Sequence, residues 1–240
     1  MKSIPYLVIF CIFFIFSTSC EKTDNKISEE EIVQGLKEAL KVGTDTSVTT
    51  ASKKDGYYGD LAIKIFLPNE AKIIVDNKES VPGLSILVDS MILKINRAAE
   101  DAAIEAQPIF INAITSMTIV DAINILNSSD TSATHYLKQT TYNELKNLFQ
   151  PKIDISLNKP IIGVSANSMW NSVTGLWNNF VDNGGWAFGY SNVNITLSEH
   201  VTNKALNGLF LKVANEEKEI RNDPVARVND ILIKVFGSKN

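Results

Sequence analysis

Residues 84–106, LSILVDSMILKINRAAEDAAIEA, form the strongest helical pattern in the chain. The first half carries a wide apolar stripe at helical spacing, made of Leu84, Leu87, Val88, Met91, Ile92 and Ile95. The second half continues the stripe with the small residues Ala98, Ala99, Ala102 and Ala103. Small side chains allow a neighbouring helix to approach closely. We therefore expect a long helix at the centre of a helical bundle.

Helical spacing recurs on both sides of this stretch. Ser28 and Glu31 form a capping box that opens a helix, and Gly43 is its expected end. Further helices are predicted near 69–77, 118–126, 140–150, 165–181, 198–222 and 225–236, with Pro151 interrupting the third of these. A brief alternation near 61–67 leaves room for one short extended segment. The sequence thus predicts a mainly α fold, a single-domain helical bundle with irregular loops over residues 29–240.

The first twenty residues have the order of a secretory signal. Lys2 precedes an uncharged apolar run, residues 6–16, which is followed by small residues and Cys20. This order resembles a bacterial lipoprotein signal peptide, residues 1–19, with acylation (palmitate) of Cys20. Residues 20–28 then read as a lipidated cysteine and flexible tether, because they are polar and lack aromatic side chains. The alternative is an ordinary cleaved signal, since Ser17 stands where lipoprotein signals prefer an aliphatic residue.

An acylated Cys20 predicts a protein of the cell envelope. We expect attachment to the outer membrane through the N-terminal lipid, because Glu21 gives no clear inner-membrane retention signal. The body would lie in the periplasm or at the cell surface. Of the 23 Lys and Arg residues only Lys2 precedes Cys20, so 22 remain against 27 Asp and Glu, a net charge of −5. No long basic run is present, and a nucleic-acid partner is not expected.

Eight polar or charged residues stand out as a candidate polar network or ligand site: Asn96, Arg97, Glu100, Asp121, Glu217, Arg221, Arg227 and Asp230. In a buried segment such groups need partners, because an unpaired buried charge is strongly unfavourable. One interpretation is structural, with arginines and carboxylates fixing the register of the helices. The other is a pocket in which the guanidinium groups bind a carboxylate or phosphate ligand. Both interpretations require buried charges, so the sequence leaves both open.

The remaining chemistry-bearing residues point to few functions. His135 and His200 lack the spacing of metal ligands, and Cys20 is the only cysteine left once the signal is removed, so neither a metal nor a cofactor is expected. The three tryptophans fall within residues 170–186. Trp170 and Trp177 share a helix face and are expected in the core. Trp186 and Tyr190 follow a Gly-Gly break and form a candidate interaction surface for a glycan or a protein.

Several blocks of the chain, taken in order, resemble one family: Gly35–Leu40, Asn96–Glu100, Pro108–Phe110, Asp121–Ala122, Ala205–Phe210, Ile220–Arg221 and Val235–Gly237. This is a family of secreted bacterial proteins known only as a domain of unknown function. The resemblance covers residues 32 to 237 and matches least well over 170–194. It implies a helical extracytoplasmic domain, and it carries over no catalytic or ligand residue.

Three functional hypotheses follow. The leading one is a membrane-anchored lipoprotein that binds or scaffolds a protein, glycan or small molecule and is not an enzyme. The second is a carrier of an apolar or acidic small molecule, with Arg97, Arg221 and Arg227 at the polar end of its cavity. The third is a hydrolase that uses Glu100, Asp121 and Glu217, which requires two of these carboxylates on opposite sides of an open cleft.

Overall fold

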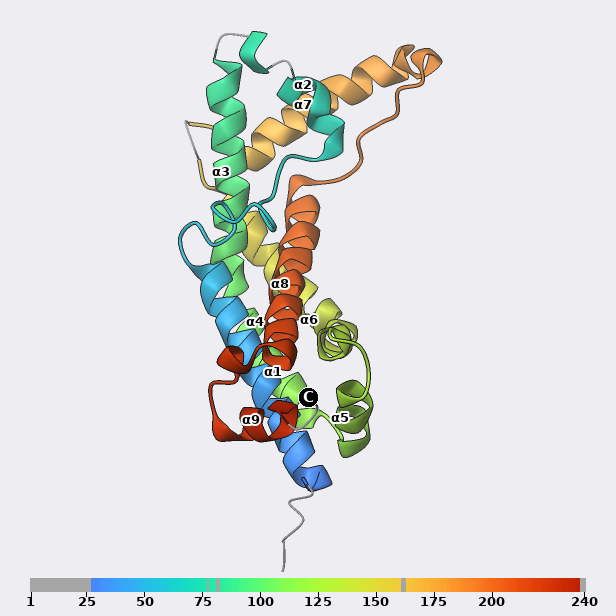
Figure 1. Ribbon diagram of the computed structural model, residues 1–240. Helices are drawn as coiled ribbons and strands as arrows, with labels where there is room; N and C mark the ends of the chain where they lie inside the picture. The colour runs from blue at the N-terminus through green and yellow to red at the C-terminus, as the bar shows by residue number, and fades with distance from the viewer. Residues whose placement is uncertain (1–26, 77, 81–82, 161–162, 238–240) are drawn as a thin grey trace, which may run out of the picture.

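The computed structural model describes residues 27–76, 78–80, 83–160 and 163–237 (Figure 1). The predicted signal peptide, Cys20 and most of the predicted tether lie outside these residues. Within the described residues the secondary structure consists of α-helices and short 3-10 helices, with no β-strand. The predicted mainly α, single-domain class is therefore confirmed.

Four long helices form the body: α1 (Glu29–Ser52), α3 (Leu84–Ala103), α6 (Ser132–Asn158) and α8 (Leu197–Asn222). α8 packs against α6 and α1, and α3 packs against α6. The stretch that predicts the central helix is α3, and its four small residues Ala98, Ala99, Ala102 and Ala103 are fully buried. Small side chains at this face let α3 approach its neighbours closely, as its sequence indicates.

The shorter elements gather at the two ends of the body (Figure 1). At one end α4 (Ala106–Ser116), α5 (Ile119–Leu126) and α9 (Asp230–Gly237) pack around the first turns of α1. η4 (Pro224–Ala226) joins α8 to α9. At the other end lie η1 (Asn69–Ala71), α2 (Lys72–Asp76) and η2 (Lys78–Ser80). From that end α7 (Ala166–Asp182), followed by η3 (Gly185–Phe188), projects beyond the body.

The helix end predicted at Gly43 and the interruption predicted at Pro151 are both wrong. α1 does not end at Gly43, which is buried against α8, where an added Cβ would lie 3.3 Å from Cβ of Glu216. The glycine therefore serves close helix packing. α6 begins at Ser132 and runs through Pro151 to Asn158. Phe149 and Ile153 beside the proline are fully buried, and their packing offsets the backbone hydrogen bond that Pro151 cannot make.

The extended segment predicted near 61–67 is not a β-strand. Residues 61–63 form a turn, and residues 64–68 lie outside any helix or strand. Ile63, Ile65 and Leu67 are nevertheless buried, as their alternation indicates. The backbone of this segment is paired with side chains of two helices instead of a neighbouring strand.

Candidate functional site

The loop between α1 and η1, residues 53–68, is fixed by a buried asparagine of α3. Asn96 is fully buried, and its Nδ2 donates to the carbonyl oxygen of Ile65 at 2.7 Å. Its Oδ1 accepts from the backbone N–H of Ile65 at 2.9 Å. Nδ2 also donates to the carbonyl oxygen of Ile92 at 2.7 Å. The amide therefore supplies both hydrogen bonds that a neighbouring strand would have given Ile65.

Glu100 holds the same loop one turn further along α3. Its Oε1 accepts the backbone N–H groups of Tyr57 and Tyr58, both at 3.1 Å. Its Oε2 accepts from Arg97 at 2.5 Å, and Arg97 also pairs with Asp55 at 2.7 Å. The hydrogen bond that Arg97 donates to Glu100 raises the pKa of Arg97 above its ordinary value. Both oxygens of this buried carboxylate are thus occupied by the protein itself.

α8 holds the opposite side of the loop. The hydroxyl of Tyr57, which is fully buried, donates to the carbonyl oxygen of Ala205 at 2.8 Å, and burial raises the pKa of this tyrosine. Nε2 of His200 lies 2.8 Å from the carbonyl oxygen of Phe66 and donates to it, while burial lowers the pKa of His200. The loop is therefore clamped between α3 and α8.

A second charged cluster lies further along α8, where Glu217 binds the N-terminus of α6. Oε1 accepts from the N–H of Ala133 at 3.0 Å, and Oε2 accepts from the N–H and the hydroxyl of Thr134 at 2.8 and 2.7 Å. Thr131, at the N-cap position of α6, provides no side-chain hydrogen bond. Glu217 supplies the missing cap, and its negative charge faces the positive end of the helix dipole.

Two arginines bind helix C-termini in the same region. Arg221 pairs with Glu217 at 2.9 Å and donates to the carbonyl oxygens of Ile125 and Leu126 at the end of α5, at 3.2 and 3.4 Å. Arg227 is buried and donates to the carbonyl oxygens of Ile220 and Arg221 in the last turn of α8, at 3.1 and 3.0 Å. Both guanidinium groups meet the negative end of a helix dipole.

The structure places six of the eight predicted polar residues in these two clusters, and Asp121 and Asp230 lie outside both. Tyr57, which Glu100 contacts, meets α8 at Ala205, twelve residues before Glu217, or about 18 Å along the helix axis. Asp121 forms a capping box with Thr118 at the start of α5. Asp230 is exposed in the first turn of α9. The carboxylates of the hydrolase hypothesis, Glu100, Asp121 and Glu217, therefore do not share a cleft.

The cavity beside the second cluster is too small for a ligand. Glu217, Arg221, Leu40 and Phe236 are among the residues that bound a space of about 10 Å³. A cavity of this size holds at most one water molecule. A carrier with Arg221 at the polar end of this cavity therefore has no room for its ligand.

α7 and the chain that follows it form what we call the aromatic arm, residues 166–196. Its return segment, residues 189–196, runs back along α7 and is held at three points. The indole N–H groups of Trp170 and Trp177 donate to the carbonyl oxygens of Ile195 and Ser191, each at 3.0 Å. Between them the side-chain amide of Asn178 pairs with the backbone of Val193. Trp170 is buried at the base of the arm, as predicted from its place on the helix face, whereas Trp177 is only partly buried and packs against Tyr190.

The tip of the arm, residues 184–190, leaves large aromatic side chains in solvent. Trp186 is 68% exposed and Phe188 is 79% exposed, while Tyr190 is 45% exposed. The Tyr190 ring packs against Trp177 and Phe180, at centroid distances of 5.2 and 6.0 Å. Gly184 and Gly189 have positive φ angles of 124° and 83°, a conformation that favours glycine at both ends of η3. The candidate interaction residues Trp186 and Tyr190 thus lie on and just after η3, the segment at the far end of the projecting α7 (Figure 1).

The arm carries further exposed apolar residues that sequence reasoning missed as site residues. Leu176 is 74% exposed, and a groove of about 360 Å³ along α7 is lined by Trp170, Val173, Leu176, Trp177 and Phe180, among others. A signal was present in the sequence, because residues 166–196 contain a single charged residue, Asp182. An uncharged stretch of this length is unusual in a chain with 21% charged residues.

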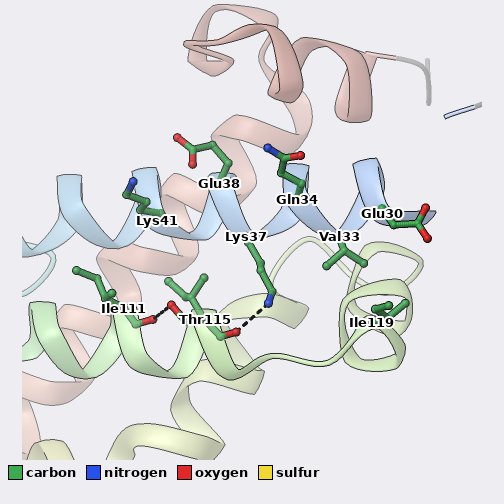
Figure 2. A pocket seen from close by; sticks show the side chains of 10 residues that line it. Glu30, Val33, Gln34, Lys37, Glu38, Lys41, Ile111, Thr115 and Ile119 are labelled. Carbon is green, nitrogen blue, oxygen red and sulfur yellow. Dashed lines mark hydrogen bonds between the residues drawn. The ribbon is translucent and has the colours of Figure 1, made fainter. Parts of the chain in front are cut away.

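A second groove, of about 470 Å³, lies between α1 and the α4–α5 pair (Figure 2). Figure 2 shows Val33 of α1 pointing toward Ile119, and Lys37 reaching across to the carbonyl oxygen of Thr115, which it meets at 2.9 Å. Glu38 and Gln34 point away from the opposing helix in this view. The groove therefore combines an apolar floor with a lysine that crosses it.

Together these features define an all-helical domain whose buried charges bind backbone groups and whose projecting arm carries a group of exposed aromatic residues. The chain belongs to the family described as "Protein of unknown function (DUF4197)", whose model matches residues 26–237. This confirms the membership in a domain family of unknown function that the sequence blocks predict. No curated protein and no solved structure matches the chain.

Among the described helices none is by itself long and apolar enough to cross a membrane. α4 and α5 meet the length and composition test only as a pair, and a bend of 101° separates them.

Proposed function

We propose that this chain is a membrane-anchored, non-enzymatic binding protein of the cell envelope whose binding surface is the aromatic arm. The observation that supports this most directly is the contrast between the charged clusters and the arm. Glu100, Glu217, Arg221 and Arg227 bind backbone groups or each other. The arm instead leaves large apolar side chains uncovered at its projecting end. Exposed aromatic clusters of this kind mark interaction sites.

The proposed anchor is an acylated Cys20 that holds the protein at the outer membrane. α1 begins at the end of the body opposite the arm, and Glu31 in its first turn forms an ion pair with Lys234 of α9 at 2.5 Å. A lipid attached just before α1 would therefore leave the arm free to meet a partner. Intact mass of the detergent-extracted protein tests this directly. A chain that begins at an unmodified residue would overturn the anchor and leave the arm unaffected.

The binding role of the arm is tested by oxidative footprinting of cells that produce the full chain. We expect Trp186 and Tyr190 to be labelled several-fold more slowly in intact envelopes than in purified residues 21–240 in detergent-free buffer, because a partner covers them in the envelope. Tyr58 and Tyr136, which are partly buried on the body, serve as internal controls and should be labelled equally in both samples. Equal labelling of the arm in both samples would overturn the proposed binding surface.

A second candidate function, a carrier of an acidic amphiphile, is favoured by the groove of Figure 2. Val33, Ile111, Ile114 and Ile119 offer an apolar lining, and the ammonium group of Lys37, which crosses the groove, would meet a carboxylate. The test is binding of a long-chain fatty acid by calorimetry to the wild type and to Ile111→Trp, which fills the groove. Loss of binding in the variant would support the carrier, and absence of binding to the wild type would overturn it.

A further inference from the structure

We infer that the tip of the aromatic arm inserts into the interfacial region of a phospholipid bilayer, with Trp186 and Phe188 entering the membrane. This rests on the proposed function, in which the arm is the binding surface, and it names the partner. It is a contact separate from the proposed N-terminal lipid. The reasons lie in the exposure, charge, hydrogen bonding and area of the arm.

The exposed residues at the tip have the chemistry of membrane-interface anchors. Trp186 and Phe188 stand on η3, which follows the far end of the projecting α7 (Figure 1), and both side chains are mostly exposed. Trp and Tyr favour the boundary between lipid headgroups and acyl chains, because their rings join an apolar face to a polar group. Tyr190 follows η3 within the tip and packs against Trp177 and Phe180. The tip therefore combines one purely apolar ring, Phe188, with two amphipathic rings, Trp186 and Tyr190.

The near absence of charged residues on the arm favours an uncharged partner. Asp182 is the only charged residue in 166–196, and no lysine or arginine is present to attract anionic lipid or an acidic protein. Insertion would therefore be driven by burial of apolar area and would need neither anionic headgroups nor low salt.

The hydrogen bonds of the arm argue against a glycan. Recognition of a sugar requires polar groups that are available to its hydroxyls. Asn178 is bonded to Val193, Asn183 to Asn179, and Asn192 to Asp182. The indole N–H of Trp177 is bonded to Ser191. These amides and this indole therefore hold the arm together, and the most exposed parts of the tip are apolar.

The size of the exposed patch argues against a second copy of this chain. Trp186 and Phe188 are mostly exposed, and Phe180 and Tyr190 are about half exposed. At about 200 Å² per aromatic side chain, the four expose roughly 500 Å² in total. A stable protein interface buries about 800 Å² on each partner. The patch falls short of that area, whereas an interfacial membrane anchor needs only a few large side chains.

The arm is also preorganised for insertion. Trp177, Phe180 and Tyr190 pack against one another at centroid distances of 5.2–6.0 Å, and three hydrogen-bonded points fix the return segment. The tip can enter a bilayer without first ordering its backbone, which keeps the entropic cost of binding low.

The experiment measures sedimentation of residues 21–240 with phosphatidylcholine vesicles, so that neither the apolar run at residues 6–16 nor an acyl group on Cys20 contributes. We expect the chain to sediment with the vesicles at low and at high salt. Trp186→Ser combined with Phe188→Ser should weaken partitioning by about 100-fold, or about tenfold for each large apolar side chain. The matched control, Leu61→Ser with Val225→Ser, removes two other highly exposed apolar residues and should leave partitioning unchanged.

A second readout locates the insertion. Vesicles made with brominated phosphatidylcholine should quench tryptophan fluorescence in the wild type. Trp186→Phe should keep partitioning and lose most of this quenching, because Trp170 and Trp177 lie below the tip. Retained quenching in Trp186→Phe would overturn insertion by the tip.

The possible failures are distinguishable. If the wild type does not sediment with vesicles while footprinting still shows the arm covered in envelopes, the membrane inference is overturned and the arm binds a protein or glycan. If the chain self-associates through the arm in analytical ultracentrifugation and does not bind vesicles, the partner is a second copy. If footprinting shows an uncovered arm, the proposed function itself fails.

Discussion

Asn178 and Val193 form a two-way pair within the aromatic arm. Nδ2 of Asn178 donates to the carbonyl oxygen of Val193 at 3.0 Å, and Oδ1 accepts from its N–H at 2.7 Å. Asn96 and Ile65 repeat the same arrangement in the body of the molecule. In both places a helix side chain satisfies both backbone groups of a residue in a segment without secondary structure. Asparagine is suited to this role because one side chain carries both a donor and an acceptor.

Replacing Asn178 should loosen the arm and leave the body unchanged. Asn178→Ala removes two hydrogen bonds from Val193, each contributing about 1 kcal/mol. We expect amides of residues 189–196 to exchange with solvent roughly tenfold faster, with little change in the urea midpoint. Hydrogen exchange monitored by mass spectrometry checks this. Asn171→Ala, an exposed position on the same helix, is the control, and equal exchange in the two variants would contradict the prediction.

Replacing Asn96 should instead destabilise the whole fold. Asn96→Leu leaves the N–H and the carbonyl oxygen of Ile65 buried without partners, at a cost of about 1–3 kcal/mol for each group. We expect the free energy of unfolding to fall by about 2–5 kcal/mol in urea titrations. Asn124→Ala, on the exposed face of α5, should change it by no more than about 0.5 kcal/mol. A loss of under about 1 kcal/mol in Asn96→Leu would contradict this account.

Periodicity predicted the fold well because most helices bury one face. The stripe of α3 and the capping box at Ser28 both describe local chemistry, and both lie in the structure where the pattern places them. The helix breaks predicted at Gly43 and Pro151 are wrong because these positions are decided by contacts between helices and not by local chemistry. There, packing against other helices overrides a local preference, and such contacts cannot be read from neighbouring residues.

The candidate site was predictable only as a set of residue types. The sequence singles out Glu217 and Arg221, but their partners lie far away in the chain, at the ends of α6 and α5. A capping side chain supplied by another helix leaves no local motif. The arm was easier to predict from the sequence. A run with a single charge, three tryptophans and two adjacent glycines can be recognised without a structure.

Glu217 should be a strong determinant of stability. Glu217→Ala leaves two N–H groups of α6 without their cap and leaves Arg221, which is largely buried, without its carboxylate. Removing one partner of a buried pair typically costs about 3–5 kcal/mol. We expect a loss of this size in urea unfolding, with the fold retained at low temperature as judged by circular dichroism.

A double-mutant cycle separates the energy of the Glu217–Arg221 ion pair from the energy of the helix caps that the two side chains provide. If Glu217 and Arg221 act together, Glu217→Ala combined with Arg221→Ala should be less destabilising than the sum of the single variants, by about 1–3 kcal/mol. Arg227→Ala, which removes a cap from α8 without touching Glu217, should add independently and serves as the control. Simple additivity of Glu217→Ala and Arg221→Ala would contradict the coupling.

His200 should make stability depend on pH in mildly acidic solution. Burial lowers its pKa in the folded protein, with a smaller effect in the same direction from Lys204 and opposing effects from the Phe66 hydrogen bond and Glu70. The unfolded chain, with an ordinary histidine pKa of about 6.5, then binds more protons than the folded one between the two pKa values. The free energy of unfolding therefore rises with pH through this window. The stability that the neutral His200 contributes is fully present above about pH 6.5. It is lost as the pH falls toward the pKa of His200 in the folded protein.

The comparison variant for this prediction is His200→Gln, because an amide can donate to the carbonyl oxygen of Phe66 and does not titrate. Urea unfolding at about pH 7.5 and about pH 5 should show a larger loss of stability in the wild type than in the variant. Glu216, whose pKa is raised by burial, and Asp60, whose pKa is lowered by its hydrogen bond to Lys212, titrate in both proteins. Their contributions cancel in the difference. Equal pH dependence in the two proteins would mean that His200 is protonated as easily in the fold as in water.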